Sequence, residues 1–141
     1  MLSLKDNIEQ VKKKELSDAF AFKQQKVDEK EALENTYKLL EEQMKAELTS
    51  GKINPTVMEQ LGTYKKLVAA KIVEAQKAVD KAHELVLKAQ ENLREAVKER
   101  KILETLKEKH IEAQMTLERQ AEQILLDEIV SYKYITKEGG S

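Results

Sequence analysis

The sequence predicts an all-α protein in which two long helices form an antiparallel coiled-coil hairpin, with the second helix much longer than the first. Only one cluster of turn-forming residues, at positions 49–55, divides the body of the chain. After it, nothing except Gly62 interrupts a helical pattern as far as about residue 133. The composition agrees, because 36% charged and only 4% aromatic residues are typical of paired helices and not of a globular core.

The first helix is expected at about residues 4–48. In its second half, apolar residues recur every three or four positions, as they do on one face of a helix, at Leu33, Tyr37, Leu40, Met44 and Leu48. In its first half, the stripe that starts at Leu4 is interrupted at Glu15 and Asp18 and resumes at Ala19. We interpret the interruption as a shift of register and expect looser pairing over residues 15–26.

The predicted turn carries signals for the end of one helix and the start of the next. Gly51 can adopt the left-handed conformation that ends a helix. Asn54 and Pro55 fit the N-cap and the first position of the following helix. A connection this short makes the two helices antiparallel neighbours. We expect the second helix at about residues 55–133, and a flexible tail at 134–141, within one domain of 141 residues.

The second helix contains a heptad pattern that predicts the seam of a coiled coil. Valine, leucine and arginine recur every seven residues, and alanines form a second row between them. The alanine row further predicts that the partner backbone packs closer than the usual ~8–10 Å between helix axes. The expected seam consists of Ala75, Val79, Ala82, Val86, Ala89, Leu93, Ala96, Arg100 and Leu103.

The unequal helix lengths predict an overhang. A first helix of about 45 residues covers only about the first 45 of roughly 79 residues, at ~1.5 Å of rise each. Leu4 should therefore lie near Lys101. Beyond it, apolar residues continue to the end of the helix, and leaving each exposed costs roughly 1.5–3 kcal/mol relative to burial. A foreign partner or a second copy of the chain would cover them. They include Leu106, Ala113, Leu117, Ala121, Ile124, Leu125, Leu126, Ile129 and Val130.

No catalytic or metal-binding pattern is present. His83 and His110 lie roughly 40 Å apart on one helix, and Asp80 with His83 would supply only two metal ligands. There is no phosphate-binding glycine loop or nucleophile elbow. We therefore expect no enzyme activity, no cofactor, no metal and no small-molecule substrate.

The charge balance and the absence of cysteine narrow the class further. The chain has 25 basic and 26 acidic residues, so its net charge does not recruit nucleic acid or an anionic membrane. It contains no cysteine, and no apolar run approaches the ~18 residues that a membrane span needs. These features suit a cytoplasmic protein.

Several short motifs, in order along nearly the whole chain, resemble the FliJ family of bacterial flagellar type III export proteins. The family's opening and its hairpin break are matched, and the last motif resembles its acidic motif near the C terminus. The matching segments are Leu4-Lys5-Asp6, Lys14-Glu15-Leu16-Ser17-Asp18-Ala19, Gly51-Lys52-Ile53, Tyr64-Lys65-Lys66-Leu67-Val68, residues 101–109 and Glu122-Gln123-Ile124-Leu125-Leu126-Asp127-Glu128.

The resemblance implies a non-enzymatic, cytoplasmic component of the flagellar export apparatus, needed for motility. Proteins of this family are helical hairpins similar to the rotor stalk of rotary ATPases. They are thought to insert into the hexameric export ATPase and promote its assembly, to link it to the export gate in the membrane, and to escort export chaperones. Contact with the membrane would be made only through these partners.

The resemblance also implies positions for two contacts. Tyr64, Leu67 and Val68 match the region that faces the export gate, although Lys71 and Glu74 put charges on a face expected to be apolar. The chain ends would contact the ATPase, through Leu4, Lys5, Asp6, Leu125, Leu126, Asp127, Glu128 and Ile129.

Two alternatives remain at the level of sequence. One is the equivalent stalk of a virulence-type secretion injectisome, which would differ mainly in its ATPase and gate partners. The other is a structural coiled coil that dimerises through its overhang.

Overall fold

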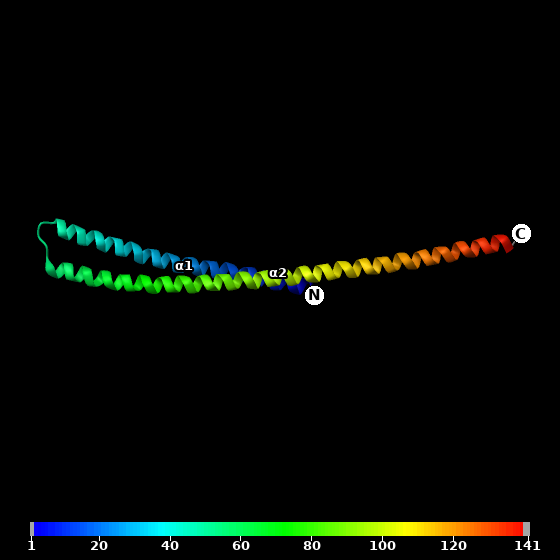
Figure 1. Cartoon of the computed structure of the whole chain (residues 1–141), viewed down its shortest axis with the longest axis horizontal. Helices are drawn as coiled ribbons and strands as arrows, with labels where there is room; N and C mark the ends of the chain where they lie inside the picture. The colour runs from blue at the N-terminus through cyan, green and yellow to red at the C-terminus, as the bar shows by residue number, and fades with distance from the viewer. Residues whose placement is uncertain (1, 140–141) are drawn as a thin grey trace. The chain divides into compact units, whose positions relative to one another are not determined.

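A computed structural model describes the backbone of residues 2–139 and the side chains of residues 3–135. The described chain consists of two α-helices, α1 (Leu2–Thr49) and α2 (Pro55–Gly139). Figure 1 shows the single connection between them. The predicted fold class is confirmed, including the much greater length of the second helix, which has 85 residues against 48.

α2 continues to Gly139, past the helix end expected at about residue 133. The reason is local: between Gly62 and Gly139 the chain has neither glycine nor proline, so no residue favours ending the helix earlier. Residues 140–141 lie outside the described part of the chain.

The turn has the predicted conformation. Gly51 adopts a left-handed φ of 77°, which glycine accepts without the steric cost of a Cβ atom. The Oδ1 atom of Asn54 accepts a hydrogen bond from the Thr56 N–H at 3.0 Å, as an N-cap residue does. The Asn54 N–H in turn donates to Oε1 of Glu47 at 2.9 Å, which ties the start of α2 to the last turns of α1.

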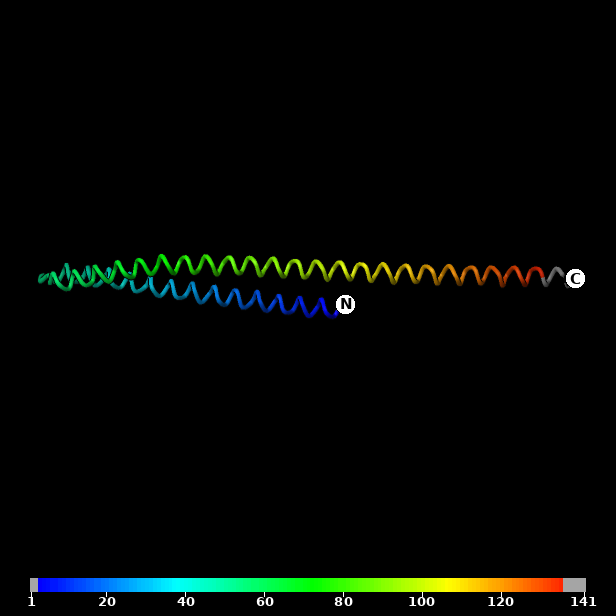
Figure 2. Tube along the Cα trace, turned by 90° about the horizontal axis from the view of Figure 1, so that it is seen from below, coloured from blue at the N-terminus to red at the C-terminus, as the bar shows by residue number. Residues whose placement is uncertain are grey.

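The chain divides into two units, one formed by Asn7–Ala96 and the other by Met1–Asp6 with Val97–Ser141. In the first unit the two helices run antiparallel and side by side (Figures 1 and 2). Lys65 Nζ lies 3.6 Å from Glu41 Oε1, and Lys23 Nζ lies 3.0 Å from His83 Nδ1. The residue numbers of both pairs add up to 106, so the register is the same at these two levels.

The seam of the hairpin follows an unbroken alternation of three- and four-residue steps on both helices. Every residue of the expected α2 seam is buried or half-buried, and Val68, Ala82, Val86 and Ala96 are the most buried side chains of α2. On α1, the corresponding buried or half-buried row is Glu9, Lys12, Leu16, Ala19, Lys23, Lys26, Lys30, Leu33, Tyr37, Leu40, Met44 and Glu47.

The expected shift of register over residues 15–26 is therefore wrong. The apolar stripe is interrupted there because lysines occupy seam positions, not because the seam moves to another face. The side chains of Lys12, Lys26 and Lys30 are only 25–31% exposed, since a lysine can bury its aliphatic stem while its ammonium group stays at the surface.

Candidate interaction surfaces

The C-terminal part of α2 has no covering element among the described residues. From Thr105 to Ile135 every side chain is exposed, as the predicted overhang requires. Its large apolar side chains are exposed too, for example Leu106 at 57% and Leu117 at 65%. We call residues 105–135 the exposed segment.

Apolar and acidic side chains gather near the end of the exposed segment. Leu125 and Leu126 are 56% and 55% exposed, and Ile129 is 43% exposed. Asp127 Oδ1 accepts a hydrogen bond from Gln123 Nε2 at 3.1 Å within the helix, and Glu128 is exposed beside it. This cluster offers a partner both apolar area and carboxylates.

The other expected part of the ATPase contact, at the start of α1, is already engaged within the chain. Lys5 Nζ lies 2.7 Å from Glu99 Oε2, and Arg100 Nε lies 3.8 Å from Asp6 Oδ1. The hydrogen bond from Lys5 and its positive charge lower the pKa of Glu99 below its ordinary value. Leu4 is 60% exposed and the Asp6 side chain 62%, whereas the Lys5 side chain is only 28% exposed.

The structure does not bring the two parts of this expected contact together. Lys5 pairs with Glu99, and from Glu99 to Leu125 the helix rises about 39 Å at ~1.5 Å per residue. One partner could touch both parts only by covering this length of α2.

The expected gate contact needs a correction, because Val68 is only 1% exposed. Seven-residue spacing places it in the seam between Leu61 and Ala75, where it packs toward α1 and cannot touch a partner while the hairpin is closed. Tyr64 and Leu67 remain accessible to a partner, at 47% and 50% exposed.

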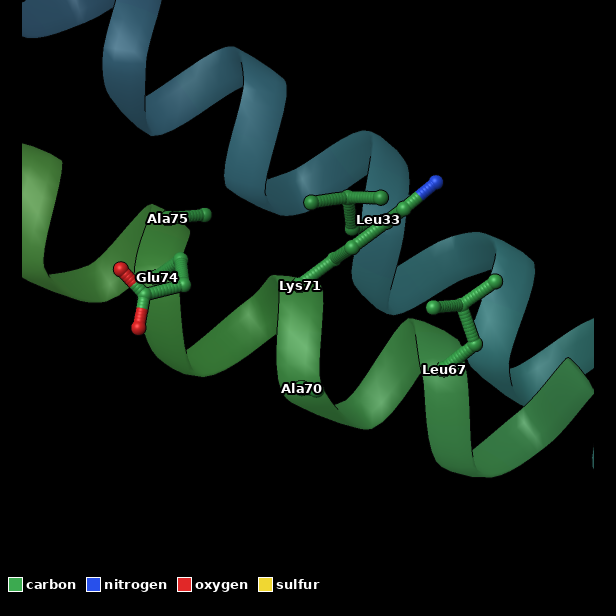
Figure 3. A pocket seen from close by; sticks show the side chains of 6 residues that line it. All are labelled: Leu33, Leu67, Ala70, Lys71, Glu74 and Ala75. Carbon is green, nitrogen blue, oxygen red and sulfur yellow. The ribbon is translucent and has the colours of Figure 1, made fainter.

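Leu67 is shared by two shallow grooves on the first unit. One is lined by Leu33 of α1 and by Leu67, Ala70, Lys71, Glu74 and Ala75 of α2. Figure 3 shows the Lys71 side chain reaching toward α1 beside Leu33, while the Glu74 carboxylate lies at the far end from Leu67. The second groove is lined by Thr56, Glu59, Gln60, Thr63, Tyr64 and Leu67.

Sequence reasoning missed Leu33 and Ala70 as part of this surface. Ala70 was recognisable, because it lies three positions after Leu67 and so shares its face of the helix. Leu33 was not, because its position beside Leu67 depends on the register between the helices.

The histidines do not form a site with other ligands. His83 Nδ1 accepts a hydrogen bond from Lys23 Nζ, whereas Asp80 Oδ1 accepts one from Gln76 Nε2. His110 lies in the exposed segment. Among the described residues, no group of three or more potential ligands could hold a metal ion. No helix within residues 2–139 is long and apolar enough to cross a membrane.

Two long helices that pair along a seam of alternating three- and four-residue steps form a coiled-coil hairpin. The family model described as flagellar FliJ protein matches residues 1–139. The chain therefore belongs to the FliJ family, whose members are components of the flagellar export apparatus. No curated protein and no solved structure matches the chain.

Proposed function

We propose that this protein is a non-enzymatic, cytoplasmic stalk of the flagellar export apparatus, and that its exposed segment binds the hexameric export ATPase. The observation that carries the proposal is the run of exposed side chains from residue 105 to residue 135, which includes many large apolar ones. The match to a flagellar family favours this over the injectisome alternative.

The energetics favour a partner on the exposed segment. Burying a leucine or isoleucine contributes roughly 1.5–3 kcal/mol, so the cluster at Leu125, Leu126 and Ile129 can supply a large share of a binding free energy. The adjacent Asp127 and Glu128 favour a partner surface that is basic around an apolar centre. Such a surface at the collar of a ring would receive the end of a helix.

The start of α1 forms a second, smaller part of the proposed ATPase contact. Leu4 is accessible to a partner without any change in the hairpin. The Lys5 side chain is only 28% exposed, and both Lys5 and Asp6 are already paired with residues of α2. We therefore assign most of the affinity to the exposed segment.

The double variant Leu125→Ser/Leu126→Ser tests the ATPase contact. We expect it to lose most of the stimulation of ATPase assembly and turnover, because two apolar anchors are removed. A matched control is Leu85→Ser/Leu87→Ser, since these leucines are 51% and 50% exposed but lie on the paired part of α2. The control should stimulate like the unchanged chain.

Two outcomes would contradict the ATPase proposal. Equal loss of stimulation in both double variants would mean that the position of the leucines does not matter. A change from dimer to monomer in sedimentation, seen only with Leu125→Ser/Leu126→Ser, would identify the exposed segment as a self-association surface.

We further propose that Tyr64 and Leu67, with the groove that reaches Leu33, contact the cytoplasmic domain of the export-gate membrane protein. Val68 is excluded from this contact because it is buried in the seam. The groove is mostly apolar, with Lys71 and Glu74 at its edge, so its partner should present an apolar side chain bordered by charge.

The variant Tyr64→Ala/Leu67→Ala should weaken binding to the isolated gate domain by about tenfold or more, measured by calorimetry, since two half-exposed anchors disappear. Val73→Ala is a suitable control, because Val73 is 56% exposed on another face of the same helix. If Val73→Ala weakened binding as much, the contact would not be confined to the groove.

Escort of export chaperones belongs to the same proposal, without residues assigned to it. Binding of a chaperone to the chain, measured with and without its cargo, tests this part separately. A preference for the cargo-loaded chaperone would contradict it.

A further inference from the structure

The open end of the hairpin differs from the rest of the seam in what holds it. Leu4, the apolar residue nearest the start of α1 whose side chain is described, is 60% exposed and contributes little burial. Two ion pairs join residues 3–6 to residues 97–104, Lys5 with Glu99 and Asp6 with Arg100. Both belong to the same unit of the chain.

These ion pairs are linked to each other through α2. Glu99 and Arg100 are consecutive residues, and Arg100 Nη1 also donates to Glu104 Oε1 at 2.6 Å. Arg100 is 22% exposed, while Glu99 and Asp6 are 54% and 62% exposed. The carboxylates are therefore open to solvent and dissolved ions, which screen exposed pairs strongly.

We propose that residues 3–6 of α1 form a clasp that is held on residues 97–104 of α2 by charge, and that this clasp opens and closes with ionic strength. The inference does not rest on the proposed function, because it concerns the chain alone. Its consequence is regulatory: opening frees Lys5 and Asp6 and lengthens the part of α2 that a partner can cover. A densely charged partner surface would open the clasp in the same way as salt.

Acid should open the clasp as well. Because the pKa of Glu99 is lowered by Lys5, its contribution is present above the ordinary pKa of a glutamate and is lost as the pH falls through the lowered value. Glu99 is paired with Lys5, and Asp6 is paired with Arg100, which also pairs with Glu104.

The chain contains no cysteine, so pairs of spin labels can be introduced cleanly. One pair, Leu4→Cys with Lys101→Cys, reports on the clasp. A second pair, Asp18→Cys with Leu87→Cys, lies two heptads further into the hairpin at equivalent helix positions and serves as the control. All four side chains are exposed, so the labels need not disturb the seam.

The measurement is the distribution of distances within each labelled pair as salt rises from about 0.05 M to about 1 M, where the screening length falls to ~3 Å. We expect the clasp pair to change from a narrow short distance to a broad long one, while the control pair stays narrow. A clasp pair that is insensitive to salt, or a control pair that broadens with it, would overturn the proposal.

Charge reversal provides the second arm. Lys5→Glu or Glu99→Lys alone should open the clasp even at low salt, because each puts two like charges together. The combined variant exchanges the charges and should close it again. If the combined variant stayed as open as the single ones, the pairing of Lys5 with Glu99 would not be what holds the clasp.

Discussion

Residues 7–96, apart from the turn at 50–54, and residues 105–135 are helical and carry many apolar side chains, yet only the first region buries any of them. Leu40 is 6% exposed in the hairpin, whereas Leu126 is 55% exposed near the end of α2. A leucine in a helix is therefore not buried by the helix itself. It is buried only where a second helix lies opposite it.

The two regions also differ in what occupies the seam positions. In the hairpin, α2 places valine, leucine and alanine there. When the same spacing is continued past Leu103, it reaches Lys107, His110 and Gln114 first, and then the apolar residues Leu117, Ala121 and Ile124. The seam spacing therefore continues into the exposed segment, with polar residues over 107–114 and apolar residues again over 117–124.

The largest difference in stability should appear when one leucine from each region is truncated. Leu40→Ala should lower the free energy of unfolding by about 2–3 kcal/mol, the lower part of the usual range, because a two-helix seam can relax around the cavity. Leu126→Ala should change it by less than about 0.5 kcal/mol. Urea unfolding followed by circular dichroism measures both, and similar losses would erase the distinction between the regions.

A smaller effect should come from filling the alanine row of the seam. Ala82→Leu should cost about 1–3 kcal/mol, because Ala82 is fully buried and added methylenes overpack the interface. Lys88→Leu, at an exposed position of the same helix, should leave the free energy of unfolding almost unchanged. Ala89→Leu should fall between them, because Ala89 is half-buried.

The register between the helices gives a testable reason why Ala82→Leu should lower the free energy of unfolding. Lys23 lies at the level of Ala82 and His83, so the alanine leaves room for a lysine stem. In thermal unfolding, Lys23→Ala combined with Ala82→Leu should recover part of the stability lost by Ala82→Leu alone. Simple additivity of the two changes would mean that another neighbour sets the available space.

The smallest expected effect is an increase in stability from replacing Gly62, near the start of α2. Gly62→Ala should raise the free energy of unfolding by about 0.5–1 kcal/mol, because nothing lies within 4 Å of the added Cβ and alanine favours a helix. Gly51→Ala is the matched control, and it should destabilise the turn because Gly51 has a φ of +77°. A loss at Gly62 would show that the glycine has a role beyond the helix itself.

Local signals were enough to predict most of the fold. Asn54, Pro55 and Gly51 identified the turn because capping and left-handed conformations depend on single residues. The heptad row from Ala75 to Leu103 identified the α2 seam because helical periodicity is fixed by backbone geometry. The close approach of the helix axes, inferred from the alanines, stays a prediction.

The assignment of residues to the seam or to a partner contact depended on which residues of the other helix lie opposite them. Here the sequence predicted the structure less accurately. Val68 was assigned to a partner contact, although its position in the heptad places it in the seam. The stretch over residues 15–26 was interpreted as a shift of register, because lysines at seam positions look like a break until the burial of their stems is seen.

The sequence by itself determined the two helices, their single turn and the length of α2 that α1 cannot reach, because each follows from residue spacing and the fixed rise of a helix. Only the tertiary structure decided which lysines share the seam, that Leu33 joins Leu67 in one groove, and that Lys5 and Asp6 pair with Glu99 and Arg100. The physical reason is the register between the helices, which brings together residues far apart in the chain and which no local pattern specifies.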